Sequence, residues 1–277
     1  MSHALLHHRT FVHPEPRDWV VMVHGAGGSS NIWFKQLKAY RAEFNVLLLD
    51  LRGHGASKAI VKNLIEGQYC FRSVTKDVVE LLDHLKIRSA HFVGISLGTI
   101  IIRTLAELEP QRVKTMVLGG AVTRLNRFSQ VLVRLGNALK NVVPYMWLYK
   151  LFAWIIMPKK AQAPSRHLFV REARRLCQKE FKRWFRLAAE VNPLMRYFKE
   201  KELAIPTLYI MGENDHMFLK PVKEMARHHA SADLAVIQDC GHVCNVENAD
   251  RFNRLSLAFL NRHSQTVEPP PANAPAA

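Results

Sequence analysis

The sequence predicts an α/β fold, in which a mostly parallel central sheet carries helices on both faces. Along most of the 277 residues, short apolar runs alternate with longer segments of helical periodicity, as in strands joined by crossover helices. The runs contain too few polar residues to leave one sheet face in water. This alternation stops near residue 122 and resumes near residue 204. We therefore predict a core of residues 1–121 and 204–263, with residues 122–203 as an inserted helical cap.

The predicted strands are short apolar runs bounded by glycine, proline or polar residues. They cover residues 18–23, 44–50, 90–95, 113–119, 205–211 and 233–238, and a further short strand is expected within residues 5–12. The predicted helices have apolar side chains three and four positions apart. They cover residues 31–43, 71–86, 97–109, 217–229 and 245–262. The last segment, residues 264–277, is rich in Pro and Ala and is expected to be disordered.

The positive charge is concentrated in the predicted cap. The chain has a formal net charge of +16, and Val122 to Glu202 hold 18 basic and five acidic residues, an excess of 13. One interpretation is a solvated helical face; the other is attraction to an anionic lipid surface, with Trp147 and Trp154 at the interface. No recognition motif for nucleic acid accompanies the charge, so we do not expect a nucleic-acid partner. The basic residues of the first interpretation are Arg171, Arg174, Arg175, Lys182, Arg183 and Arg186.

The predicted cap is also rich in aromatic residues. They are expected to form a small core of the cap and to cover an apolar pocket, in which each methylene of an acyl chain would stabilise binding by about 0.8 kcal/mol. These residues are Tyr145, Trp147, Tyr149, Phe152, Trp154, Phe169, Phe181, Trp184, Phe185, Tyr197 and Phe198.

The cysteines and the apolar segments indicate a reducing, cytoplasmic location. Four cysteines show no paired zinc-ribbon spacing, and the cluster Cys240-Gly-His242-Val-Cys244 supplies too few ligands for a metal site. We therefore expect buried thiols and no metal. The first residues contain no apolar run of signal-peptide length. The most apolar stretch, residues 142–157, is interrupted by Pro144 and Lys150 and is too short to span a bilayer.

A candidate nucleophile lies between a predicted strand and a predicted helix. Gly94-Ile95-Ser96-Leu97-Gly98 places a serine on a tight strand-to-helix turn. The flanking glycines allow the close packing that such a turn requires. Its hydroxyl would stand clear of the backbone, at the positive end of a helix.

A base and an acid follow in the order Ser, Asp, His. A serine hydroxyl needs a base within hydrogen-bond reach, and that base needs an orienting partner. Asp215 follows the strand predicted at 205–211, and His242 follows the strand predicted at 233–238. Both therefore lie at the same edge of a parallel sheet as Ser96. Glu213 and Asp239 are alternative candidates for the acid.

The glycine-rich segment after the first buried strand is a candidate oxyanion hole. His24-Gly25-Ala26-Gly27-Gly28 can present backbone N–H groups to a tetrahedral intermediate. We predict the amides of Ala26 and Leu97 as donors, with Gly25 and His24 in the same substrate-binding group. The same glycines, followed by Asp50, also imitate a dinucleotide-binding motif. That motif lacks its third glycine and leaves the serine, aspartate and histidine unexplained, so no cofactor is expected.

Together, the motifs HGAGG, DLRGHGAS, GISLG, GENDH and GH resemble the α/β-hydrolase family over residues 18–262, apart from the cap. The resemblance implies an acyl-serine intermediate on esters, thioesters, amides or lactones, or carbon–carbon bond cleavage by the same triad. It also implies that the first strand of the family is missing, because the stretch before His24 is short. We predict a serine esterase for a small-molecule ester with an apolar acyl group. A lipase, thioesterase, lactonase, carbon–carbon hydrolase and non-catalytic binding module are the alternatives.

Overall fold

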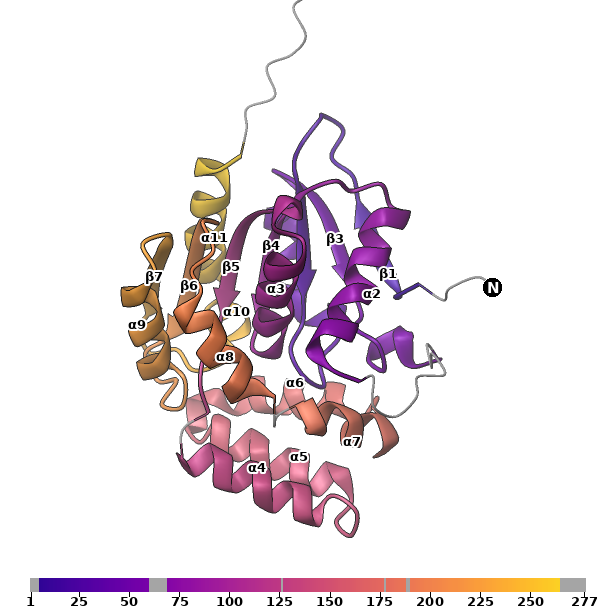
Figure 1. Cartoon of the computed structure of the whole chain (residues 1–277), viewed down its shortest axis with the longest axis vertical. Coiled ribbons are helices and arrows are strands. Elements are labelled where there is room, and N and C mark those ends of the chain that lie inside the picture. Colours follow the sequence, from indigo (N-terminus) through magenta and orange to yellow (C-terminus); the bar gives the residue numbers. More distant parts are fainter. Residues whose placement is uncertain (1–4, 60–68, 126, 177, 188–189, 265–277) are drawn as a thin grey trace, which may run out of the picture.

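The structure, a computed structural model, describes residues 5–59, 69–125, 127–176, 178–187 and 190–264. The segment 264–277 predicted to be disordered lies outside these ranges apart from its first residue. Within them, seven strands form one sheet in the order β1-β3-β2-β4-β5-β6-β7 (Figure 1). Only β1 runs antiparallel to its neighbour, so the predicted mostly parallel sheet is confirmed. The strands are β1 His8–Phe11, β2 Trp19–Val23, β3 Asn45–Leu49, β4 Ala90–Ile95, β5 Val113–Gly119, β6 Thr207–Gly212 and β7 Ala232–Ile237.

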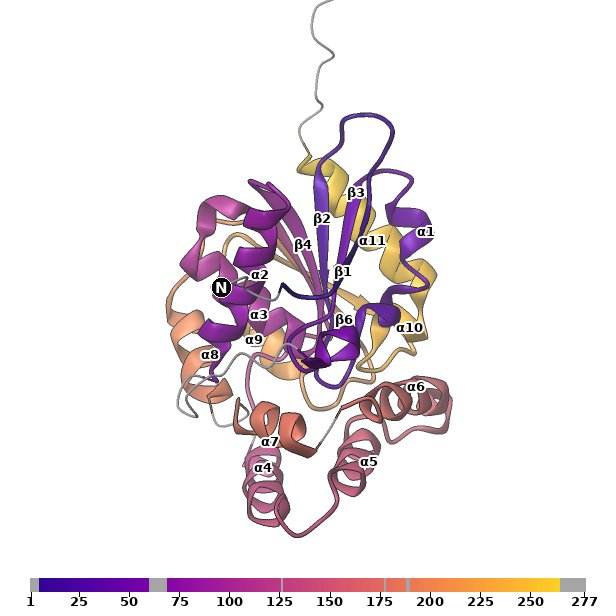
Figure 2. The ribbon, with the colours of Figure 1, turned by 90° about the vertical axis from the view of Figure 1, so that its right-hand side faces the viewer.

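Helices cover both faces of the sheet. Figure 2 shows α1, α10 and α11 on one side and α2, α3, α8 and α9 on the other. Their bounds are α1 Leu37–Tyr40, α2 Phe71–His84, α3 Leu97–Leu108, α9 Leu219–His228, α10 Cys244–Glu247 and α11 Ala249–Arg262, with short 3₁₀ turns at Ser30–Trp33, Gly55–Ala59 and Pro110–Arg112.

Two predicted helices are interrupted. The helix expected at 31–43 is a 3₁₀ turn followed by the single turn α1, and the Ser29 side chain caps its start by accepting a hydrogen bond from the Asn31 amide. The helix expected at 245–262 is divided at Asn248, whose backbone is not helical (φ −137°, ψ 71°). Its side chain accepts a hydrogen bond from the Arg251 amide and so starts α11 as a new helix.

The central strands are buried on both faces. In β2, Val21 and Val23 belong to the apolar cluster on the α2 and α3 side, whereas Val20 and Met22 belong to the cluster on the α11 side. Strands β3 and β4 are also buried at every position. This explains why they read as continuous apolar runs rather than as alternating ones.

Five helices separate β5 from β6: α4 Arg127–Leu139, α5 Tyr145–Ile156, α6 Ala163–Ala173, α7 Gln178–Leu187 and α8 Val191–Glu200. Figures 1 and 2 show α4 to α7 beyond one end of the sheet. These helices have a small core of their own, to which α5 contributes Leu148 and Tyr149 and α7 contributes Phe181. By contrast, α8 lies beside the sheet and adds Met195 and Phe198 to its core. Among the described residues, no helix is both long and apolar enough to cross a bilayer.

Candidate active site

Ser96 occupies a strained turn between β4 and α3. Its backbone has φ 53° and ψ −123°, a conformation that costs a non-glycine residue about 1–3 kcal/mol. Gly98 permits this turn, because a Cβ there would overlap the Val23 carbonyl oxygen. The Ser96 amide donates to the Gly119 carbonyl at 2.9 Å, which ties the turn to β5. The side chain is left partly exposed at the strand end.

The structure brings Ser96, His242 and Asp215 together as a hydrogen-bonded chain. His242 Nε2 lies 2.9 Å from Ser96 Oγ, and His242 Nδ1 lies 2.8 Å from Asp215 Oδ2. Asp215 has no exposed surface, and its Oδ1 accepts from the Phe218 amide at 3.1 Å. A carboxylate can only accept from the ring, so Nδ1 carries the proton and Nε2 is the free base facing the serine.

The two alternative acids do not reach the histidine. Glu213 Oε2 instead accepts from the Asp239 backbone amide at 3.2 Å. Asp239 itself sits in a left-handed turn with φ 52°. Among the three candidates, only Asp215 is hydrogen-bonded to His242 in the described structure.

The loop that carries His242 is held by Glu247, a residue that the sequence analysis missed. Glu247 Oε2 accepts from the Gly241 amide at 2.7 Å, and its Oε1 accepts from the Val243 amide at 3.3 Å. One carboxylate therefore binds the amides on both sides of His242. Burial raises the pKa of Glu247. The acidic residue five positions after the histidine was the available signal.

The oxyanion candidates lie next to the serine. A Cβ built on Gly25 would lie 3.7 Å from Ser96 Oγ. Two amides of the glycine-rich segment are occupied, since Gly28 donates to the Gly25 carbonyl at 3.1 Å and Gly27 donates to His54 Nε2 at 2.9 Å. In the described residues, the amides of Ala26 and Leu97 donate no hydrogen bond within the protein. These are the two donors that the sequence predicts.

His24 and His54 support this segment from behind. Each Nε2 accepts from a backbone amide, that of Leu51 for His24 and that of Gly27 for His54. Each Nδ1 therefore carries the proton and donates to a carbonyl oxygen. Burial lowers the pKa of His24. For His54, burial and the nearby His24 ring together lower the pKa to about 3. The His24 ring is fully buried, and both of its nitrogens are bonded to backbone groups of these loops.

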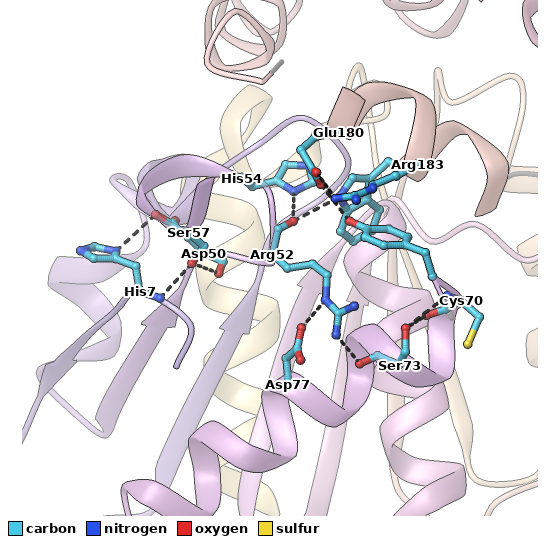
Figure 3. A network of polar contacts seen from close by, with 12 residues as sticks. His7, Asp50, Arg52, His54, Ser57, Cys70, Ser73, Asp77, Glu180 and Arg183 are labelled. Carbon is cyan, nitrogen blue, oxygen red and sulfur yellow. Dashed lines mark hydrogen bonds and ion pairs between the residues drawn. The ribbon is translucent and has the colours of Figure 1, made fainter. Parts of the chain in front are cut away.

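The loop after β3 is held by a network of polar contacts (Figure 3). Asp50 accepts from the amides of Ser30 at 2.6 Å and Ala56 at 2.9 Å. Because its carboxylate is occupied in this way, Asp50 does not fit the ribose-binding acid of a dinucleotide site. In the same loop, the Arg52 guanidinium forms an ion pair with Asp77 of α2. These contacts of Asp50 and Arg52 hold the loop in place.

Three helices of the segment 122–203 touch these loops. From α5, the Tyr149 hydroxyl donates to the Ala26 carbonyl at 2.6 Å. From α6, Glu172 Oε2 accepts from the Ser29 hydroxyl at 2.7 Å. From α7, Trp184 Nε1 donates to the Arg52 carbonyl at 3.2 Å. No pattern in the sequence distinguished these residues from the other polar and aromatic residues of the segment.

The cysteine cluster near His242 is buried. Cys240 and Cys244 have almost no exposed surface, and burial raises the pKa of Cys240 to about 12. Both thiols lie against carbonyl oxygens, those of Gly241 and Ile210. Within the described ranges, no three His, Cys, Asp or Glu side chains are grouped as metal ligands.

A mostly parallel sheet that presents Ser, Asp and His in this chain order at one edge defines the α/β-hydrolase class of proteins. The family described as alpha/beta hydrolase fold matches residues 18–146. The chain is 29% identical to the putative carbamate hydrolase RutD of Stutzerimonas stutzeri, covering 87% of this chain and 91% of that protein. A solved hydrolase of Pseudomonas aeruginosa has a TM-score of 0.77 at 26% identity, covering 91% of this chain and 93% of that one.

A further relative is longer than this chain. The identity is 31% to the dihydrolipoyllysine-residue acetyltransferase component of the acetoin cleaving system of Pseudomonas putida, over 88% of this chain. The chain spans 64% of the length of that protein. On these findings the chain has the fold of the α/β-hydrolase family, and it is similar to hydrolases of that fold over most of its length.

Proposed function

We propose that the protein is a serine hydrolase that cleaves a carboxylic ester through an acyl-serine intermediate. The observation that carries this proposal is the chain from Ser96 Oγ to His242 Nε2 at 2.9 Å and from His242 Nδ1 to Asp215 Oδ2 at 2.8 Å. Both distances are those of hydrogen bonds. The geometry supports proton transfer from the serine to the histidine during attack.

In the proposed reaction, Ser96 Oγ attacks the ester carbonyl while His242 Nε2 takes the hydroxyl proton. The oxyanion accepts hydrogen bonds from the Ala26 and Leu97 amides, which have no other partner in the described structure. His242 then gives its proton to the leaving alcohol. A water molecule, deprotonated by His242, releases the acid and regenerates the serine. Asp215 keeps the imidazole in the required tautomer throughout.

We further propose that residues 122–203 act as a cap over this site and favour an apolar acyl group. The Phe218 ring lies 5.0 Å from the His242 ring. Phe218 and Leu97 belong to the same apolar cluster as Ile155 and Ile156 of α5. An acyl chain bound to Ser96 would therefore meet apolar side chains from both the core and the cap.

Hydrolysis of p-nitrophenyl esters from acetate to palmitate, with wild type beside Ser96→Ala, tests this function. We expect the substitution to lower turnover on the order of 10⁶-fold, because it removes the nucleophile of a triad that acts as a unit. A near-normal rate in Ser96→Ala would refute the assignment of the serine. If esters are inert but a carbamate or lactone is cleaved and the cleavage depends on Ser96, ester cleavage is wrong while the triad stands.

A further inference from the structure

Exposed apolar side chains gather on the hairpin formed by α4 and α5. Of the eleven large apolar side chains exposed among the described residues, seven lie between residues 131 and 154. Their spacing is that of one helix face in α4 and one in α5, joined by the tip of the hairpin. We call them the hairpin face: Val131, Leu135, Leu139, Val142, Trp147, Leu151 and Trp154. Figures 1 and 2 show α4 and α5 at the end of the molecule farthest from the C-terminal end of α11.

The hairpin face is bordered by positive charge. Residues 110–171 contain no Asp or Glu. A hollow of about 450 Å³ adjoins the face at Trp154, and the Arg166 guanidinium lies 4.0 Å from the centroid of that indole ring. The other residues that line the hollow are Lys150, His167, Val170, Arg171 and Arg174, none of which is acidic.

The nearest carboxylates of the neighbouring helices point inward. Glu172 of α6 is 4% exposed and accepts from Ser29, and Glu180 of α7 is 6% exposed and contacts Tyr69 and Arg183. The buried Glu172 also forms ion pairs with Arg171 and Arg175. The outer side of these helices therefore presents cations to the solvent, and the two carboxylates paired with Arg171, Arg175 and Arg183 are themselves buried.

A second group of cations lies at the tip of the hairpin. Burial and the positive charges of Arg186 and Lys182 lower the pKa of Lys140. Lys140 follows α4 and is close to Val142, the most exposed apolar residue of the hairpin face. An anion bound here would relieve the mutual repulsion of these three side chains.

We propose that the hairpin face docks the protein onto an anionic lipid bilayer. The exposed aliphatic and indole side chains would enter the boundary between headgroups and acyl chains, while the bordering cations would contact headgroup phosphates. A nucleic acid would not bury the aliphatic side chains of Val131, Leu135 and Val142. A second copy of this chain would bring two positively charged surfaces together. The inference does not depend on ester cleavage.

Co-sedimentation of the full chain with lipid vesicles tests this proposal. We expect binding to vesicles of phosphatidylcholine mixed with phosphatidylglycerol, weak binding to phosphatidylcholine alone, and loss of binding as salt is raised. Lys150→Gln with Arg174→Gln should lower the partition coefficient about 25-fold, since each cation near the surface contributes about 5-fold. The matched control is Arg251→Gln with Arg254→Gln, two exposed cations on α11 whose loss should change binding little.

The apolar contribution has its own matched pair of variants. Val142→Ser should weaken binding severalfold, and adding Trp147→Ser should bring the loss to about 10-fold or more. Val12→Ser is the control, because Val12 is 71% exposed and Val142 is 83% exposed. Equal binding to neutral and anionic vesicles, wild-type binding by the hairpin variants, or binding to an oligonucleotide but not to vesicles would each overturn the proposal. So would concentration-dependent self-association that is abolished by Val142→Ser in the absence of lipid.

Discussion

Replacing Tyr149 with phenylalanine removes one hydroxyl that links α5 to the proposed oxyanion hole. Tyr149 is 6% exposed, and its hydroxyl donates to the Ala26 carbonyl at 2.6 Å. Burial raises the pKa of Tyr149, so the hydroxyl remains protonated and a donor at neutral pH. The same hydroxyl lies against Gly27, where a Cβ would overlap it. The variant therefore removes one of the two hydrogen bonds that hold the peptide between Ala26 and Gly27, whose N–H remains bonded to His54. This peptide is next to the one whose N–H is proposed to bind the oxyanion.

The expected loss follows from the cost of an unsatisfied carbonyl. A buried acceptor without its donor costs about 1–3 kcal/mol. If the transition state bears this cost, kcat falls by about 5- to 150-fold. Removing an oxyanion donor outright costs about 10²- to 10³-fold, which sets an upper limit because Tyr149 acts through Ala26. We therefore expect kcat to fall about 10-fold for Tyr149→Phe, with KM nearly unchanged.

Steady-state kinetics on the preferred p-nitrophenyl ester measures this split. The control is Tyr145→Phe, which loses a hydrogen bond of the same length, 2.6 Å, from the same helix to the Leu176 carbonyl. In chemical denaturation, the free energy of unfolding of Tyr145→Phe should fall by about as much as that of Tyr149→Phe, while kcat of Tyr145→Phe is retained. The reasoning is refuted if Tyr149→Phe keeps kcat within about 2-fold of wild type, or if Tyr145→Phe loses as much activity.

Two further predictions concern the acid and the buried histidines. Asp215→Asn should lower kcat on the order of 10⁴-fold, because the histidine loses its required tautomer. Asp239→Asn should leave kcat nearly unchanged. Equal losses of ester hydrolysis in the two variants would contradict the assignment of Asp215 as the acid. Since the pKa of His54 is lowered to about 3, unfolding takes up a proton below about pH 6.5, the ordinary value for histidine. Because of His54, the free energy of unfolding should therefore decrease by about 1.4 kcal/mol for each unit by which the pH falls between 6.5 and 3. Urea unfolding at several pH values should show this slope reduced in His54→Gln, and an unchanged slope would contradict the burial argument.

The sequence predicted those parts of the fold that depend on local pattern. Strands β4 and β5 match their predicted bounds because each is an uninterrupted apolar run. The turn at Ser96 was predictable because Gly94 and Gly98 flank it. The break at Asn248 was missed, since apolar periodicity continues across it and only the capping side chain marks the start of α11.

The contacts from the segment 122–203 could not be predicted from the sequence. Tyr149 and Tyr145 lie four residues apart in the same helix, yet only Tyr149 is hydrogen-bonded to the glycine-rich segment. That difference depends on how α5 sits relative to a loop more than 100 residues earlier in the chain. His24 was grouped with the site because of its place in the motif, but the motif does not say on which side of the segment the ring lies.

Helix α5 is 12 residues long, which corresponds to about 18 Å of rigid rod. Its outer side carries Trp147, Leu151 and Trp154, and its inner side carries Tyr149. When such a helix moves as one body, its outer and inner sides move together. The Ala26 carbonyl is thus hydrogen-bonded to a helix whose opposite side is exposed, so a tilt of α5 imposed from outside would change the contact between Tyr149 and Ala26.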